Sequence, residues 1–133
     1  MPPNSQQLSD AESEVLKTLW RLGPSTARQI NEDLQQQGQT WAHTTVLTLL
    51  QRLEAKQCVH IDKSSFAHIF RPAVTRDKLL RGRVTDLIEN FCDGAASPML
   101  QALVKGHRFS EEEIAQFRDL LDKLEQRGKR TQD

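Results

Sequence analysis

Residues 41–53 read W-A-H-T-T-V-L-T-L-L-Q-R-L, and this stretch decides how the rest of the chain is interpreted. Its apolar residues recur at helical spacing, which predicts an amphipathic helix over residues 42–56. The apolar face consists of Val46, Leu49, Leu50 and Leu53. Thr44, Thr45 and Thr48 lie off that face, although threonine is a poor helix former and a solvated face usually carries Glu and Lys. Such a departure from the simplest helix is often functional, so this face is the first candidate site.

Two further helices are expected before this stretch. Ser9 and Glu12 have the spacing of a capping box, and the helix that they start stops at the Gly-Pro pair of residues 23–24. Ser25 is a plausible cap for the second helix, and Gly38 fits its C-terminal end. Both segments carry apolar residues on one face, which is typical of helices that share a core.

Two short β-prone runs follow the Thr-rich helix. Residues 58–62 and residues 66–71 flank a polar turn at residues 63–65, and this pattern predicts a β-hairpin that ends at Pro72. The order helix, helix, helix, hairpin is that of a winged helix-turn-helix DNA-binding domain, here residues 1–72. The fold class is therefore mainly α with a small β-hairpin.

Residues 73–133 are predicted to form a helical dimerisation domain with a frayed C-terminal tail from residue 126. Their apolar residues recur at helical spacing in two stripes. The stripes consist of Leu80, Val84, Leu87, Ile88 and Phe91, and of Ile114, Phe117, Leu121 and Leu124. Three helices and a hairpin can close their own core, so these stripes lack an obvious cover within one chain. We expect a two-fold homodimer to bury them; the alternative is that they pack back onto the winged domain.

The charge balance excludes some partners and permits others. The chain has 133 residues, and its 18 Lys plus Arg residues balance 18 Asp plus Glu residues, so the formal net charge is zero. This excludes a polycationic DNA coat but not a local basic patch. Residues 35–76 contain five basic and two acidic side chains, which places positive charge around the Thr-rich helix and the hairpin.

Cysteine content and hydropathy indicate the compartment. Two cysteines, Cys58 and Cys92, cannot build a disulfide framework or a paired-cysteine zinc site. No apolar run approaches the roughly 20 residues that span a bilayer, and residues 1–7 are unlike a signal peptide. We therefore expect a cytoplasmic protein that does not insert into a membrane.

The Thr-rich face suits a helix that enters the major groove of DNA. Small side chains let the backbone approach the base edges, hydroxyls bond phosphates or bases, and methyl groups touch thymine methyls. Leu47 is interpreted as a thymine-methyl contact, Arg52 as a phosphate contact, and Lys63 in the hairpin turn as a backbone contact. The predicted DNA-binding residues are Ala42, His43, Thr44, Thr45, Leu47, Thr48, Gln51, Arg52 and Lys63. The alternative is that these are merely tolerated surface residues.

Catalytic readings have little support in the sequence. There is no phosphate-cradling Gly-rich loop, nucleophile elbow or triad-like arrangement, so neither enzymatic activity nor a cofactor is expected. Two alternatives to a DNA-binding repressor stay open. One is a winged-helix module that binds protein, and the other is a metal-sensing repressor using Cys58, His60 and His68.

Four stretches resemble one family of transcriptional regulators. They are L-S-D-A-E-S-E-V-L-K-T-L-W at residues 8–20, S-T-A-R-Q-I at residues 25–30, the Thr-rich helix at residues 41–53, and H-I-F-R-P at residues 68–72. Their order and spacing are similar to the penicillinase repressor family, winged-helix repressors of the BlaI, MecI and CopY type. The resemblance covers residues 8–125, and T-T-V is its most specific part.

The resemblance implies a homodimeric repressor that binds an inverted-repeat operator of double-stranded DNA. The regulated genes would be those of β-lactamase, antibiotic resistance or cell-wall stress. It also implies release when a membrane sensor-protease triggers cleavage in the C-terminal domain, at a position that corresponds to Ala102-Leu103. The family's cut falls at an Asn-Phe bond, whereas this chain has its Asn-Phe pair earlier, at Asn90-Phe91, which we interpret as packing. The family often has a basic residue where Leu47 stands, so its operator sequence does not transfer directly. Copper control is not expected, because the paired cysteines of the copper-responsive branch are absent.

Overall fold

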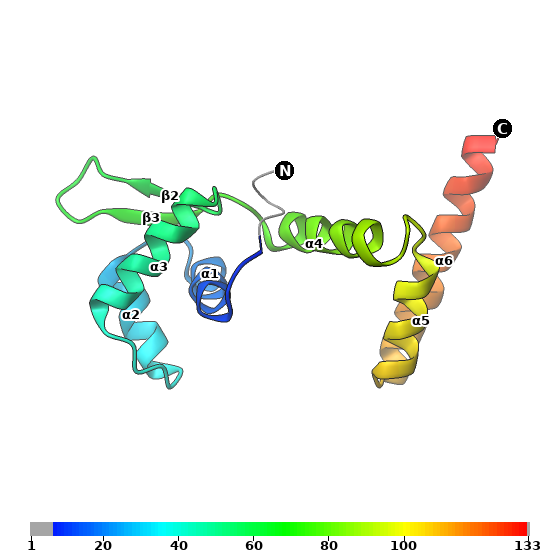
Figure 1. Ribbon diagram of the computed structural model, residues 1–133, viewed down its shortest axis with the longest axis horizontal. Coiled ribbons are helices and arrows are strands. Elements are labelled where there is room, and N and C mark those ends of the chain that lie inside the picture. The colour runs from blue at the N-terminus through cyan, green and yellow to red at the C-terminus, as the bar shows by residue number, and fades with distance from the viewer. Residues whose placement is uncertain (1–6, 133) are drawn as a thin grey trace.

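The computed structural model describes residues 7–132, and six helices and three short strands follow one another along this part of the chain (Figure 1). The prediction that residues 1–7 are not a signal peptide falls mostly on residues 1–6, which lie outside the described residues. The elements are α1 (Asp10–Leu22), β1 (Ser25–Thr26), α2 (Ala27–Gln36), α3 (His43–Ala55), β2 (Val59–Asp62), β3 (Ile69–Pro72), α4 (Arg76–Phe91), α5 (Ser97–Gly106) and α6 (Glu111–Gln132). This is the predicted fold class, a mainly helical winged helix-turn-helix followed by further helices.

Capping boxes start the first two helices. In α1 the Glu12 amide donates to Ser9 Oγ at 3.1 Å, and the Ser9 amide donates to Glu12 Oε1 at 3.0 Å, as the sequence predicts. In α2 the cap is Thr26, with Gln29 as its partner, so the assignment of Ser25 was wrong by one residue. Ser25 is buried instead, and its hydroxyl donates to the carbonyl of Gly23 at 2.8 Å.

The three strands form an antiparallel sheet in the order β1-β3-β2. The hairpin β2–β3 is confirmed, with Ile61 opposite Phe70 and Asp62 opposite Ile69. Its turn spans residues 63–68 rather than residues 63–65, because the strand pairing ends at Asp62 and Ile69. Strand β1, which pairs along β3, was not predicted.

The core of the winged domain lies between α1, α2 and α3 and is closed by the sheet. Its most buried side chains are Val15, Leu16, Thr18, Leu19, Ile30, Leu34, Val46, Leu50, Leu53 and Cys58. One charged group enters this region: Glu12 is 3% exposed and accepts a hydrogen bond from Lys56 Nζ at 2.9 Å. Burial tends to raise the pKa of Glu12, but hydrogen bonds from Lys56 and Ser9 outweigh it and lower the pKa.

Helix α4 carries the chain away from the winged domain, and α5 and α6 follow at its far end (Figure 1). Leu79 is the buried residue of α4, whereas Leu80, which the sequence analysis assigned to the apolar stripe, is exposed. Helix α6 continues to Gln132, past residue 126, where the sequence predicts that a frayed tail begins. Among the described residues, no helix combines the length and the apolar character that a membrane span requires.

Candidate nucleic-acid interface

Helix α3 separates an apolar face from a polar one along its whole length. Its buried residues are the predicted Val46, Leu49, Leu50 and Leu53. On the opposite side, Thr44, Thr48 and Gln51 are exposed at spacings of four and three residues, which aligns them in one stripe. Thr45 and Arg52 are seven residues apart on one flank of the stripe, and both are exposed. The sequence therefore places small and polar groups on the outward face.

The hydroxyls of this stripe are not equivalent. Thr48 Oγ1 donates to the carbonyl of Thr44 at 3.0 Å, so its proton is used within the helix while its lone pairs and methyl group face outward. The hydroxyls of Thr44 and Thr45 have no hydrogen-bond partner among the described residues and can both donate and accept. Thr48 is thus suited to a methyl contact, and Thr44 and Thr45 to phosphates or base edges.

The N-terminus of α3 lacks a side-chain cap. Ala42 occupies the cap position and forms no side-chain hydrogen bond there. By contrast, Ser9, Thr26 and Thr75 accept hydrogen bonds at the starts of α1, α2 and α4. Uncapped amides at a helix start, together with the helix dipole, favour an anion such as phosphate.

Leu47 differs from the predicted picture of an outward thymine contact. It is half-buried and packs against the core, on the flank of α3 that faces the hairpin. With His43 it lines a shallow groove whose opposite wall comes from Phe66, His68 and Phe70. Helix α3 and the hairpin therefore form one continuous surface.

Local hydrogen bonds order the hairpin turn. The Asp62 carboxylate accepts from the Ser64 amide at 2.9 Å and from the Ser64 hydroxyl at 2.6 Å. These bonds, followed by the charge of Arg71, lower the pKa of Asp62. Lys63 is exposed within this turn. Phe66 lies in this turn and not in the strand that its β-prone neighbours predicted, and a lone aromatic beside two serines is an unusual turn residue.

The basic residues near α3 and the hairpin fall into two groups. Lys56 is held by Glu12, and Arg71 lies 3.7 Å from Asp62, so both charges are locally balanced. Arg52 and Lys63 are exposed and have no ion pair among the described residues. These two cations remain available to an external anion, one on the helix and one on the hairpin.

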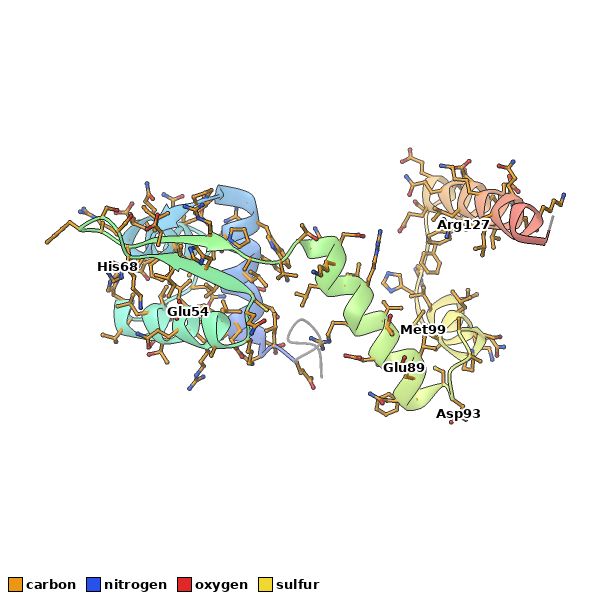
Figure 2. All side chains as sticks on the ribbon, turned by 90° about the horizontal axis from the view of Figure 1, so that it is seen from above. Glu54, His68, Glu89, Asp93, Met99 and Arg127 are labelled. Carbon is orange, nitrogen blue, oxygen red and sulfur yellow. The ribbon has the colours of Figure 1, made fainter. Side chains whose placement is uncertain are left out.

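The side chains of the metal-sensing alternative do not converge. Cys58 is buried, and burial raises the pKa of its thiol. His60 is exposed on β2 opposite Arg71, whereas His68 lies in the hairpin turn directly before β3 (Figure 2). Within residues 7–132 no group of three His, Cys, Asp or Glu side chains is placed to hold a metal ion.

The second set of predicted site residues lies on α4 and α6. Along α4, Leu80, Leu87 and Phe91 are exposed, and Val84 and Ile88 are half-buried. The predicted residues of α6 are all exposed: Ile114, Phe117, Leu121 and Leu124. Four further apolar residues are exposed, Leu100, Leu103, Val104 and Leu120. None of them was assigned to the two stripes, and Leu103 was named only as a candidate cleavage position.

The two candidate cleavage positions are both on helices. Ala102 and Leu103 are exposed within α5. Asn90-Phe91 ends α4, and Phe91 is 81% exposed, so within one chain this pair does not have the packing role expected of it. A protease would have to unwind a helix to reach either bond in extended form.

The family model and the curated relatives point to one family. The family model described as penicillinase repressor matches residues 8–123. The transcriptional regulator BlaI of Mycobacterium tuberculosis is 35% identical over 121 residues, with 90% of this chain and 86% of that protein covered. The penicillinase repressor of Bacillus licheniformis is 24% identical over 123 residues, with 92% and 95% covered. A solution structure of monomeric Bacillus licheniformis BlaI in complex with the blaP half-operator is 27% identical and covers 55% of this chain and 88% of that chain, with a TM-score of 0.47.

Proposed function

Because the chain belongs to the penicillinase repressor family, whose members are transcriptional repressors rather than enzymes, we propose that it binds operator DNA as a homodimer. The observation that carries this proposal is the outward face of α3. Thr44, Thr48 and Gln51 form a stripe of small or uncharged polar side chains, and Arg52 beside it has no ion pair among the described residues. A face without acidic groups in its centre can approach both base edges and phosphates.

In this proposal α3 lies in the major groove, where some of its residues contact base edges and others contact phosphates. Thr44 and Thr45 lie at the N-terminal end of the helix, where the hydroxyls reach base edges or phosphates. The backbone amides at the start of α3, which no side chain caps, bind a phosphate, and so does the guanidinium of Arg52. Lys63 of the hairpin binds the neighbouring phosphate backbone of the DNA. His43 and Gln51 complete the contact surface.

The dimer would form through residues 73–133, as the division into a DNA-binding unit and a dimerisation unit implies. Helices α4 to α6 present large apolar side chains to solvent, among them Leu87, Leu121 and Leu124. Large apolar side chains that are exposed in this number on successive helices mark an interaction site. A two-fold partner covers the same side chains on both copies, and it gives two recognition helices for an inverted repeat.

The regulon and the release step are extensions of this proposal. We propose control of β-lactamase or cell-wall stress genes, supported by the names of the relatives, and action in the cytoplasm, where the operator lies. Cleavage in α5 near Ala102-Leu103 by a membrane sensor-protease would remove α6 from the dimer interface. The exposed position of this bond in α5 agrees with access after local unwinding.

The experiment first lets the purified protein select fragments of its source genome. The affinity of the protein for the enriched site is then measured. Thr45→Ala combined with Thr48→Ala should weaken binding about ten-fold or more, because two contacts to bases or phosphates are lost. Thr85→Ala on α4 is the matched control, since it removes an exposed threonine far from α3. Unchanged affinity of the double variant would refute the assignment of the recognition helix. Enrichment of no site at all would favour the protein-binding alternative.

A further inference from the structure

The hairpin turn presents an aromatic ring to solvent. Phe66 is fully exposed, with a relative accessible area of 107%. Hairpin turns are normally formed by Gly, Asn, Asp and Ser, and an exposed Phe there gains nothing from the fold of its own chain. In this place the ring is fully available for contact with a partner.

The turn holds this ring outward by bonds on both sides of it. Before Phe66, Ser64 donates twice to the Asp62 carboxylate. After it, Ser65 Oγ donates to the carbonyl of Ala67 at 3.1 Å. The ring thus projects from an ordered turn rather than from a loose one, which reduces the entropy lost when it binds.

The position of the turn connects the ring to the recognition helix. The hairpin projects past the helices at the end of the winged domain that is opposite α4 (Figure 1). Phe66 and His68 of the turn line the same groove as His43 and Leu47 of α3. The residues that line this groove include no acidic side chain, and the charge of Arg28 among them is balanced by Glu32, whose Oε1 accepts from Arg28 Nε at 3.1 Å. The groove therefore has no carboxylate in its lining that would repel a polyanion extending from α3 to the turn, where Lys63 is exposed.

DNA meets both requirements, because it joins a phosphate backbone to stacked bases, and an apolar side chain can insert between these bases from the minor groove. A hairpin beside a helix in the major groove faces the neighbouring backbone and the minor groove next to it. Apolar side chains such as Phe act there as wedges that partly unstack a base step. Flexible pyrimidine–purine steps accept such a wedge more easily than stiff ones do.

We propose that Phe66 packs into the minor groove beside each half-site and selects a deformable base step that α3 does not touch. This inference rests on the proposed function, since it requires that α3 binds operator DNA. It assigns to the hairpin a sequence preference, in addition to the phosphate contact of Lys63. If the hairpin only neutralised phosphate charge through Lys63, it would give no preference for one DNA sequence over another.

The test measures affinity for the selected operator as a function of salt, with Phe66→Ala, Phe66→Leu and Lys63→Ala. Phe66→Ala should bind about ten-fold more weakly with an unchanged salt slope, because an apolar contact releases no counterion. Lys63→Ala should reduce the slope of log affinity against log salt by about one. Phe66→Leu should keep most of the affinity, since leucine also acts as a wedge.

A second readout locates the contact. With 2-aminopurine at the flanking step, wild-type protein should raise the fluorescence by unstacking the base, and Phe66→Ala should not. Replacing the flanking pyrimidine–purine step with a stiff A-tract should weaken the wild type and leave Phe66→Ala unaffected. Circular dichroism serves as the folding control, because the exposed ring contributes no packing.

The outcomes separate the two proposals. If wild-type protein selects no DNA site, the proposed function fails before Phe66 is tested. If wild-type protein binds an operator and Phe66→Ala binds it with the same affinity and flanking preference, the wedge is refuted while the recognition helix stands. Weaker dimerisation of Phe66→Ala without DNA would instead assign the ring to a protein contact and also overturn the wedge.

Discussion

Glu12 and Lys56 tie α1 to the end of α3, and this pair gives the winged domain a pH dependence. The pKa of Glu12 is lowered in the folded chain from its ordinary value near 4.5. A lowered folded pKa means that the stabilisation is present above pH 4.5 and is lost as the pH falls through the folded value. Glu12→Gln keeps an acceptor for the Ser9 amide but removes the charge opposite Lys56.

We expect Glu12→Gln to lower the free energy of unfolding at pH 7 by about 2 kcal/mol, because Lys56 loses its partner in a partly buried place. Urea titrations between pH 3 and pH 7 measure this. The difference between the variant and the wild type should shrink as the pH falls below 4.5. A difference that stays constant over this range would contradict the assigned role of the pair.

The two cysteines should differ in reactivity. Cys58 is 1% exposed, and burial raises the pKa of its thiol, so the reactive thiolate is scarce at neutral pH. Cys92 at the end of α4 is half-buried. Under native conditions iodoacetamide should modify Cys92 first, with Cys58 protected until the domain unfolds. Peptide mass spectrometry checks the order, and equal labelling rates would contradict the burial of Cys58.

At the scale of elements, the N-terminus of α3 lacks the stabilisation that a side-chain cap would give it. Ala42→Ser should stabilise the domain by about 1 kcal/mol, because a hydroxyl at the cap position satisfies a free amide. Ala42→Asp should cap the helix as well, but its charge should repel phosphate and weaken operator binding. Thermal unfolding and operator affinity, measured on both variants, separate capping from charge. Equal operator affinity of the Ser and Asp variants would exclude a phosphate near this helix start.

The elements that the sequence predicts correctly are those in which the spacing of apolar residues repeats over several turns. The apolar face of α3 repeats over several turns, so its buried residues and its outward threonines could both be assigned. Strand β1 has only two residues, Ser25 and Thr26, which are too few to show an alternation of apolar and polar residues. Ser25 is buried and its hydroxyl donates to the carbonyl of Gly23, so the cap of α2 is Thr26, the second residue of that strand.

Where the sequence analysis failed, the missing information is three-dimensional. Leu79 rather than Leu80 packs on the core because the phase of α4 is fixed by the path of the chain after Pro72. Phe66 was placed in a strand because its neighbours are β-prone. Only the pairing of Asp62 with Ile69 shows that the ring lies in the turn. Long-range register of this kind is not encoded in local composition.

At the scale of the whole molecule, the exposed apolar side chains of α4 to α6 predict concentration-dependent association. Leu87→Ser combined with Leu121→Ser should shift the chain toward monomer and weaken the dimer at least ten-fold, because two leucines lose their burial. Leu22→Ser on α1 is the matched control, an exposed leucine outside this region. Sedimentation velocity measures the mass. An unchanged dimer, or a wild type that is monomeric at all concentrations, would contradict the proposed interface.

The central claim is that two copies of α3 occupy the major groove at the halves of one operator. Protection of guanine N7 from methylation in the selected operator tests it most directly, because N7 lies in the major groove. We predict two protected clusters with centres about one helical turn apart, or a multiple of it, and weaker protection with Thr45→Ala and Thr48→Ala combined. A bound complex with no protected guanine in a G-containing operator, or with one cluster only, would contradict the account.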